Sequence, residues 1–441
     1  MASYAWLQYA AARQQLAARL ADPGKVFWSD AELGIYMCQA LRMFNALTFT
    51  WKTEYVFFSS SLWNSFATLA GSPRLRTLTD TYAYTELEYM LLEPPTGNTW
   101  TGTSQFGIAD LSQALQRRRD EILQVTNCNQ SLMPNIPLTP GTRRTILPDT
   151  VIDVARVRYI PTVAPPGVAP EPTTLNRDDT VAQEFYEPPL WQLQQATPNT
   201  FSMTSEPPLS WDTDYPPNLP GTFEAVVLQS GAPFDPISGS TLVNIPDDYL
   251  WVAEWGALAD LLGRESEATD IERAQYAMSR YQDGLKLLLN SPWIMLGKVN
   301  GQAVSVDSIE DTDNYMPGWD TTPSSFGPSL IIGGIDFFAA PLGAGIGATV
   351  LGNAPIPTTD TSFVQVSRSN WDTVLDLAQS RAMFKQGGME FQQSLELEAR
   401  AIHACAAENS RLISLGSFAD ILVQRGQAQD RSQERYMSKQ E

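Results

Sequence analysis

The sequence predicts an α+β fold, mainly α, in which a helical-bundle core carries β-strand and loop insertions and extended Pro-rich arms. Three observations lead to this prediction. Apolar residues recur at helical spacing in residues 1–128, 247–292 and 369–424. Proline pairs separate short β-like runs in residues 129–246. An Asn-Gly pair lies between apolar runs in residues 293–368, which is typical of a β-hairpin.

The N-terminal part is expected to be helical. Ser29 is followed three residues later by Glu32, a capping box that places the start of the second helix. The amino terminus lacks a basic segment followed by an apolar core, so we expect a mature helix there and not a signal peptide. The expected helices of this part are Ser3–Ala21, Ser29–Thr50, Thr79–Leu92 and Ile108–Thr126.

Residues 129–246 are expected to be a strand-and-loop insertion. The segments Thr150–Ile160 and Phe223–Leu228 are rich in β-branched and aromatic residues and are predicted to be strands. Proline pairs at 165–166, 188–189, 207–208 and 216–217 interrupt the region. We expect these Pro-rich arms to form no core of their own and to lie on a neighbouring molecule.

The segment Tyr249–Asn290 predicts two packed helices. Gly263 marks the end of the first helix, and Asp270 precedes the second. The first helix is expected to bury one broad apolar stripe, formed by Trp251, Trp255, Leu258, Leu261 and Leu262. The other face of the pair carries mixed charges that suit either solvent or polar contact with copies of the chain, namely Glu267, Asp270, Glu272, Arg273, Arg280 and Asp283.

The C-terminal half is expected to return from strands to helices. Asn300 and Gly301 predict a type I′ hairpin within Trp293–Ile309. Further strands are expected in Ile331–Val350 and Phe363–Val366, followed by helices at Trp371–Phe384 and Met389–Gln424. Gly387 and Gly388 separate these two helices. Residues 425–441 are polar and lack periodic apolar positions, so this tail is either disordered alone or ordered against a partner.

Composition and charge exclude several classes of function. The formal net charge is −20, which argues against a protein that grips nucleic acid by neutralising phosphates, although it suits a channel through which DNA slides. Three cysteines without CxxC spacing predict buried or free thiols and no zinc site. The apolar segment 330–352 contains Gly and Pro, which favours strands or a loop over a membrane helix.

The candidate enzyme motifs lack residues or context that their chemistry requires. His403 is the only histidine, which removes most metal and catalytic-triad sites. The glycine-rich Gly343–Ala348 lacks a following helix, so we expect no dinucleotide site, and no P-loop motif occurs. Asp212 and Asp214, or the acidic run Asp307–Asp313, offer paired carboxylates for sugar cleavage or cation binding, but acidic loop clusters are common in a chain of this charge. We expect neither an enzyme nor a cofactor.

Two arginine clusters are expected to make salt bridges. Arg117, Arg118 and Arg119 lie on a predicted helix beside Asp120 and Glu121, which favours a helix-surface or subunit salt-bridge role over phosphate contact. Arg143 and Arg144 form the second cluster.

Three helical segments resemble the head-to-tail adaptor (connector) proteins of tailed bacteriophages: Trp28–Leu47, Trp251–Gly284 and Leu375–Phe391. In that family a helical core forms a ring, usually a dodecamer, around the DNA channel below the portal. Loops and terminal segments dock on the neighbouring rings. This chain is larger than is usual for the family, because residues 129–246 and 293–366 are apparent elaborations.

The resemblance implies a structural virion protein of the neck or tail region, assembled in the host cytoplasm. Its partners would be other copies of itself, the portal protein, the tail or next neck ring and possible fibres, with DNA passing through without specific binding and no membrane contact. The tail after Gln424 would dock on a neighbouring ring through Arg425, Arg431, Arg435 and Tyr436. The rival interpretation is a fibre-attachment or host-carbohydrate-binding virion protein that uses the loops around Trp211 and Trp319.

Overall fold

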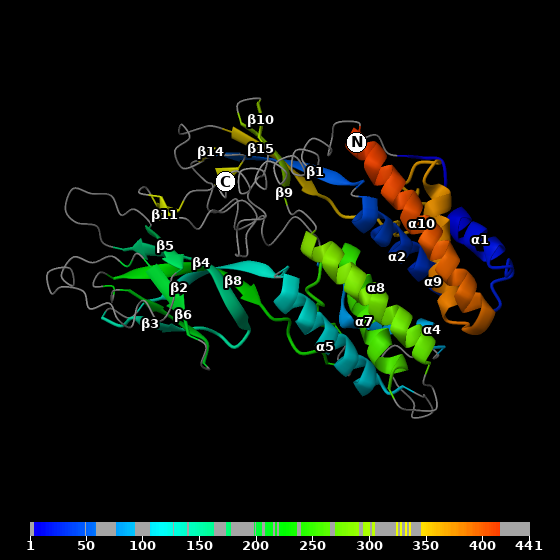
Figure 1. The fold of residues 1–441 in the computed structure, drawn as a ribbon, viewed down its shortest axis with the longest axis horizontal. Helices are drawn as coiled ribbons and strands as arrows, with labels where there is room; N and C mark the ends of the chain where they lie inside the picture. The colour runs from blue at the N-terminus through cyan, green and yellow to red at the C-terminus, as the bar shows by residue number, and fades with distance from the viewer. Residues whose placement is uncertain are drawn as a thin grey trace, which may run out of the picture.

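The structure, a computed structural model, is α+β and mainly α (Figure 1). Helices gather at one end of an elongated molecule, a seven-stranded sheet lies at the other end, and a second sheet lies along one side. The structure describes residues 4–48, 50–58, 76–92, 106–126, 128–138, 141–162, 173–177, 198, 200–204, 208–214, 217, 220–235, 240–264, 270–290, 294–299, 302–304, 323–324, 327–328, 331–332, 335–336 and 345–414.

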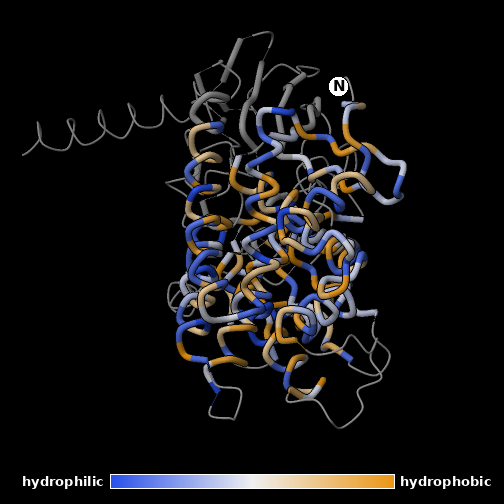
Figure 2. Tube along the Cα trace, turned by 90° about the vertical axis from the view of Figure 1, so that its right-hand side faces the viewer, coloured by the Kyte–Doolittle hydropathy of each residue, from blue (hydrophilic) through white to orange (hydrophobic). Residues whose placement is uncertain are grey.

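The helical body combines segments from both ends of the chain. Helices from the first and last parts pack together on one side, and α5, α7 and α8 pack on the other, around one continuous apolar core. The hydropathy colouring in Figure 2 alternates along these helices, as expected for helices with one face in a core. The helices of the body are α1 (Tyr9–Arg19), α2 (Asp30–Thr48), α4 (Asp80–Met90), α5 (Ile108–Thr126), α7 (Leu250–Leu262), α8 (Ile271–Asn290), α9 (Trp371–Phe384) and α10 (Gly388–Ser414).

Most expected helices are confirmed, with a shorter first helix. Residues 4–8 are not helical, because this segment pairs with the distant end of the chain. Gln8 forms a β-bridge with Phe363, and the Trp6 indole Nε1 donates to the Val366 carbonyl oxygen over 2.7 Å. The prediction of a strand at Phe363–Val366 is therefore wrong. This segment forms a single β-bridge, which binds the N-terminal segment of the chain.

The start of α2 is confirmed, but the capping box is only half formed. The Ser29 Oγ accepts a hydrogen bond from the Glu32 N–H over 3.2 Å. The Glu32 side chain does not complete the box, because it is buried and bound to Lys385 and Tyr36.

The single apolar stripe expected for α7 is wrong. The short 3₁₀ turn η2 (Asp247–Tyr249) leads into α7, and every residue of α7 except Asp260 is buried. A helix surrounded on all sides needs no polar face, yet α7 carries Glu254 at zero exposure. In contrast, α8 is amphipathic as predicted, with Ala274, Ala277 and Tyr281 on its buried face.

Residues 130–229 form a rolled seven-stranded sheet with its own core. The strand order is β2-β8-β4-β5-β6-β7-β3, and all neighbours are antiparallel except β5 and β6. The strands are β2 (Gln130–Pro137), β3 (Arg144–Ile146), β4 (Val151–Pro161), β5 (Thr173–Arg177), β6 (Thr200–Met203), β7 (Ser210–Thr213) and β8 (Gly221–Gln229).

The connection between its two edge strands explains why the sheet is rolled. The seven chain steps from Pro137 to Arg144 span at most about 24 Å. A flat sheet would separate β2 from β3 by six strand spacings, about 29 Å. Side chains near both edges, Ile136 and Leu147, accordingly share one core with Trp211 and Phe223.

The expectation that this region forms no core of its own is therefore wrong for its strands. Both predicted strands, Thr150–Ile160 and Phe223–Leu228, lie in the sheet. The proline pairs at 165–166 and 188–189, on which the expectation rested, lie outside the described residues.

A four-stranded antiparallel sheet links the two halves of the chain in the order β1-β15-β9-β10. It contains β1 (Lys52–Phe58), β9 (Ile294–Val299), β10 (Gln302–Val304) and β15 (Gly345–Leu351). The predicted hairpin is confirmed by the pairing of Val299 with Gln302. Its turn residues, Asn300 and Gly301, lie outside the described part. Most of the glycine-rich Gly343–Ala348 lies in β15, in agreement with the expectation that it is no dinucleotide loop.

The C-terminal helices begin and break where predicted. α9 spans Trp371–Phe384, and Gly387 and Gly388 have φ angles of +70° and +58°, a conformation that favours glycine. α10 is described to Ser414, so the remainder of the expected Met389–Gln424 helix lies outside the described residues. None of the described helices is long and apolar enough to cross a bilayer.

Candidate functional site

A buried cluster of charged and polar side chains lies at the centre of the helical body. Arg381 of α9 pairs with two carboxylates: its Nε donates to Glu86 Oε1 over 2.7 Å, and its Nη2 donates to Glu254 Oε2. Both glutamates have zero exposure and Arg381 is 5% exposed. The three residues come from α4, α7 and α9, so one guanidinium joins three helices that are far apart in the sequence.

Gln39 of α2 joins the same cluster through its amide group. Its Nε2 donates to Glu86 Oε2 over 2.5 Å and to Glu254 Oε1 over 3.3 Å. The neighbouring Arg42 donates to the Tyr82 hydroxyl over 2.9 Å. α2 is thereby bound to α4 and α7 by polar contacts as well as by its apolar face.

A second buried ion pair lies directly after the C-terminal end of α9, four residues from Arg381. The Lys385 Nζ donates to Glu32 Oε1 over 2.5 Å, and the Tyr36 hydroxyl donates to the same oxygen over 2.8 Å. The Lys385 ammonium also lies 4.5 Å from the centre of the Phe27 ring and 5.5 Å from that of Trp28. This ion pair joins the start of α2 directly to the C-terminal end of α9.

Burial dominates the electrostatics of these acids. Desolvation, together with the nearby Glu86, raises the pKa of Glu254 well above its ordinary value, despite the attraction of Arg381. Desolvation alone raises the pKa of Glu398 on α10 to about 8. The Arg280 guanidinium is 4.0 Å from Glu398 and partly in solvent, so its attraction does not offset the burial. Glu398 therefore carries its proton at pH 7.

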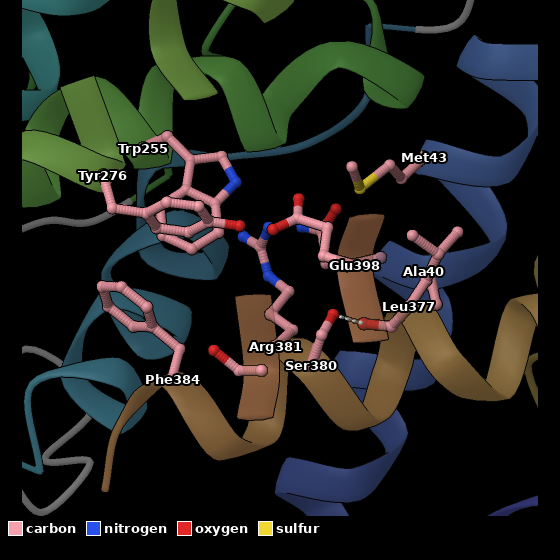
Figure 3. A pocket seen from close by; sticks show the side chains of 11 residues that line it. Ala40, Met43, Trp255, Tyr276, Leu377, Ser380, Arg381, Phe384 and Glu398 are labelled. Carbon is pink, nitrogen blue, oxygen red and sulfur yellow. Dashed lines mark hydrogen bonds between the residues drawn. The ribbon is translucent and has the colours of Figure 1, made fainter. Parts of the chain in front are cut away.

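The space beside the cluster is too small for a substrate. The cavity that Arg381, Gln39 and Glu398 line is about 10 Å³, enough for one water molecule, whereas small-molecule sites measure hundreds of Å³ (Figure 3). Ser380, whose hydroxyl donates to the Leu377 carbonyl oxygen, also lines it. The contacts of the cluster fix the helices to one another.

The arginine cluster predicted on α5 is confirmed as a salt-bridge site but lies largely in the interior. Arg118 Nε donates to Asp260 Oδ2 over 2.9 Å, and its Nη1 donates to Glu121. Arg119 is 1% exposed and donates to the carbonyl oxygen of Ala232. The predicted helix-surface or subunit role is therefore wrong for these two residues, because both arginines are themselves buried and their partners belong to the same chain.

Arg119 also fixes the exit of the seven-stranded sheet. Its guanidinium lies 4.2 Å from the centre of the Phe234 ring and contacts the backbone of Gly231 and Ala232. A Cβ atom at Gly231 would lie 2.5 Å from the Arg119 Nη1, so only glycine fits there without a shift. The sheet is thereby attached to α5 at the point where β8 ends.

The carboxylates considered for sugar cleavage do not form a described catalytic pair. Asp212 accepts hydrogen bonds from Arg144 Nε and Nη2 over 2.9 and 2.8 Å, so the second arginine cluster also forms a salt bridge. Trp211 has zero exposure and cannot offer its ring to a sugar. Asp307–Asp313 and Trp319 lie outside the described residues.

The remaining predicted sites lie at the surface, in the interior or in the tail outside the described residues. His403 is exposed on α10. Cys128 and Cys405 are buried and Cys38 is half-buried, and none of the three is joined in a disulfide, as expected. Among the described residues, no group of three or more His, Cys, Asp or Glu could hold a metal ion. The docking residues Arg425, Arg431, Arg435 and Tyr436 lie outside the described part.

Sequence reasoning missed the charge cluster, although one signal for it was present. Glu254 is the only charged residue among the first ten of α7, in a run that includes Trp251, Trp255 and Leu258. A carboxylate placed among so many apolar residues indicates a buried partner. No family model matches the chain, and no curated protein matches it.

Proposed function

We propose that this protein is a structural virion protein that forms a head-to-tail adaptor ring between portal and tail and lines part of the DNA channel. The observation that carries the proposal is a rigid helical body that ends in exposed apolar side chains. We call this surface the apolar end: Val26, Phe27, Ile271 and Met389, of which Val26 and Met389 are 90% and 76% exposed. Apolar side chains grouped on a surface mark a contact with another protein.

Three segments of the chain meet at the apolar end. The Phe27 ring lies against the Lys385 ammonium, and the Arg273 Nη1 donates to the Lys385 carbonyl oxygen over 3.4 Å. Residues 26–27, the start of α8 and the turn before Met389 are therefore neighbours. The apolar end therefore combines three segments that are far apart in the sequence, which suits a subunit that transmits contacts. The net charge of −20 also suits a lumen that does not retain DNA.

The first test is the mass of the purified protein, measured by light scattering or native mass spectrometry, with and without a candidate portal ring. We expect a ring of about a dozen copies, or a monomer that assembles only on the portal. A stable monomer or trimer that ignores the portal would contradict the proposal. Measurable sugar binding in addition would favour the carbohydrate-binding alternative.

The second test uses the apolar end directly. Ile271→Ser combined with Met389→Ser should leave the fold intact, because both side chains are in solvent, and should weaken assembly or portal binding. Ile146→Ser is the matched control, since Ile146 is 64% exposed on the edge strand β3, far from the helical body. Equal assembly of the two variants would remove the apolar end from the proposal.

The third test concerns the tail. Deletion of residues 425–441 should preserve the folding of the helical body and weaken docking to a neighbouring ring. Loss of folding after this deletion would count against the docking role that we propose for Arg425, Arg431, Arg435 and Tyr436.

A further inference from the structure

Two buried polar groups in the helical body lack a protein partner and line the same cavity. They are the Gln39 Oε1 and the Trp255 Nε1–H, each with almost no exposed surface. The residues come from α2 and α7, and α10 contributes Ser394 and Glu398 to the same walls. Leaving either group unpaired in the interior would lower the stability of the folded protein.

The orientation of the Gln39 amide is fixed by its other contacts. Both N–H groups of its Nε2 are taken by the carboxylates of Glu86 and Glu254. A rotated amide would place its oxygen against the Glu86 carboxylate, which is paired with the Arg381 guanidinium and has no proton to donate. The Oε1 is therefore an acceptor on the cavity side.

The Trp255 indole provides a donor to the same space. Its ring is held by edge contacts with Phe384, at 4.8 Å between centres, and Tyr276, at 5.7 Å. In Figure 3 its nitrogen points to the side on which Arg381 and Glu398 lie. An indole N–H can only donate, so it requires an acceptor there.

The chemistry of the walls selects the occupant. A cation would face the Arg381 guanidinium and the indole N–H, whereas an anion would face the Gln39 Oε1 and the Glu398 carboxyl group. Only a small molecule that both donates and accepts satisfies the whole set. A cavity of about 10 Å³ has room for one such molecule of the size of water.

We propose that this cavity is a binding site for one internal water molecule, which accepts a hydrogen bond from Trp255 Nε1 and donates one to Gln39 Oε1. Its second hydrogen is directed to the oxygens of α10, where the Ser394 hydroxyl already donates to the Phe391 carbonyl oxygen and can still accept. The water thus joins α2, α7 and α10. It is part of the helical body whatever the body's role in assembly.

The test is the magnetisation transfer between water and tryptophan indole protons in ¹⁵N-tryptophan-labelled full-length protein. We expect a cross-peak between the Trp255 Hε1 and a long-lived water. Trp251 is the matched control, because its ring is also buried but its Nε1 already donates to the Asp248 carbonyl oxygen over 2.9 Å. Trp255→Phe and Trp251→Phe assign the two signals.

A second variant tests the water site in a protein that remains folded. Ser394→Val adds a methyl group to the cavity wall and should abolish the Trp255 cross-peak while circular dichroism still reports a folded protein. A wild-type Trp255 signal without a water cross-peak would overturn the proposal. A crystal structure with no water density within hydrogen-bond distance of both Gln39 Oε1 and Trp255 Nε1 would overturn it as well.

Discussion

Replacement of Glu398 by glutamine should stabilise the protein at neutral pH. Burial raises the pKa of Glu398 from 4.5 to about 8, so at pH 7 the folded chain holds a proton that the unfolded chain releases. The gap between pH 7 and the unfolded value is 2.5 units, worth about 3 kcal/mol at about 1.4 kcal/mol per unit. Glutamine has nearly the same shape and no proton to hold, so Glu398→Gln should recover most of this free energy.

The sign of the effect fixes its pH dependence. The folded state binds the extra proton, so the wild-type protein loses stability as pH rises from about 4.5 to about 8 and no further above that. The difference in unfolding free energy between Glu398→Gln and wild type should be near zero at pH 4.5. It should grow to about 3 kcal/mol at pH 7 and level off near 5 kcal/mol above pH 8.

Urea denaturation at a series of pH values between 4.5 and 8.5 measures this difference. Glu396→Gln is the control, because Glu396 is exposed on the same helix two residues away, and its effect should stay within about 0.5 kcal/mol. A Glu398→Gln difference that does not change with pH would refute the assignment of a buried, protonated carboxyl group.

Three other substitutions test the packing. Arg381→Met leaves Glu86 and Glu254 without their cation and should lower the unfolding free energy by about 3–5 kcal/mol in urea titrations, whereas the exposed Arg368→Met should change little. Gly231→Ala should lower the unfolding free energy by about 1–3 kcal/mol, because the added Cβ would overlap the Arg119 guanidinium. Gly24→Ala is the control, because a Cβ there would make only ordinary contacts. Equal losses in the two variants would contradict the predicted overlap. Trp211→Ala should cost about 3–5 kcal/mol and unfold the seven-stranded sheet first in near-ultraviolet circular dichroism; an unchanged sheet would show that Trp211 is not a core residue.

The sequence predicted the elements with strong local signals. Helices α5 and α9 have the predicted bounds, because each combines helical spacing with clear ends. Gly387 and Gly388 marked the break between α9 and α10, since positive φ angles favour glycine. The β9–β10 hairpin followed from a turn pair that imposes its geometry over only two residues.

Features that depend on distant partners were not predicted. Glu86, Glu254 and Arg381 are separated by more than 100 residues each, so no local pattern connects them. α7 is buried on all sides because α5, α8 and the rest of the helical body surround it. The sequence of α7 alone does not show these neighbours, so a single buried stripe was predicted. The core of the seven-stranded sheet was not predicted, because the prolines between the strands were taken as a sign that the whole region has no core.

The joining of the first and last helices determines when this chain can fold during synthesis. The Trp6 indole binds the Val366 carbonyl oxygen. The buried Glu32 of α2 binds Lys385 directly, and the buried Gln39 of α2 is connected to Arg381 of α9 through the charge cluster. A ribosome therefore releases α2 long before Lys385 and Arg381 emerge, and the intervening chain carries unsatisfied polar groups and exposed apolar faces. Contacts this distant slow folding. Chains truncated before Trp371 should need chaperones or be degraded, so only completed chains should enter an assembly.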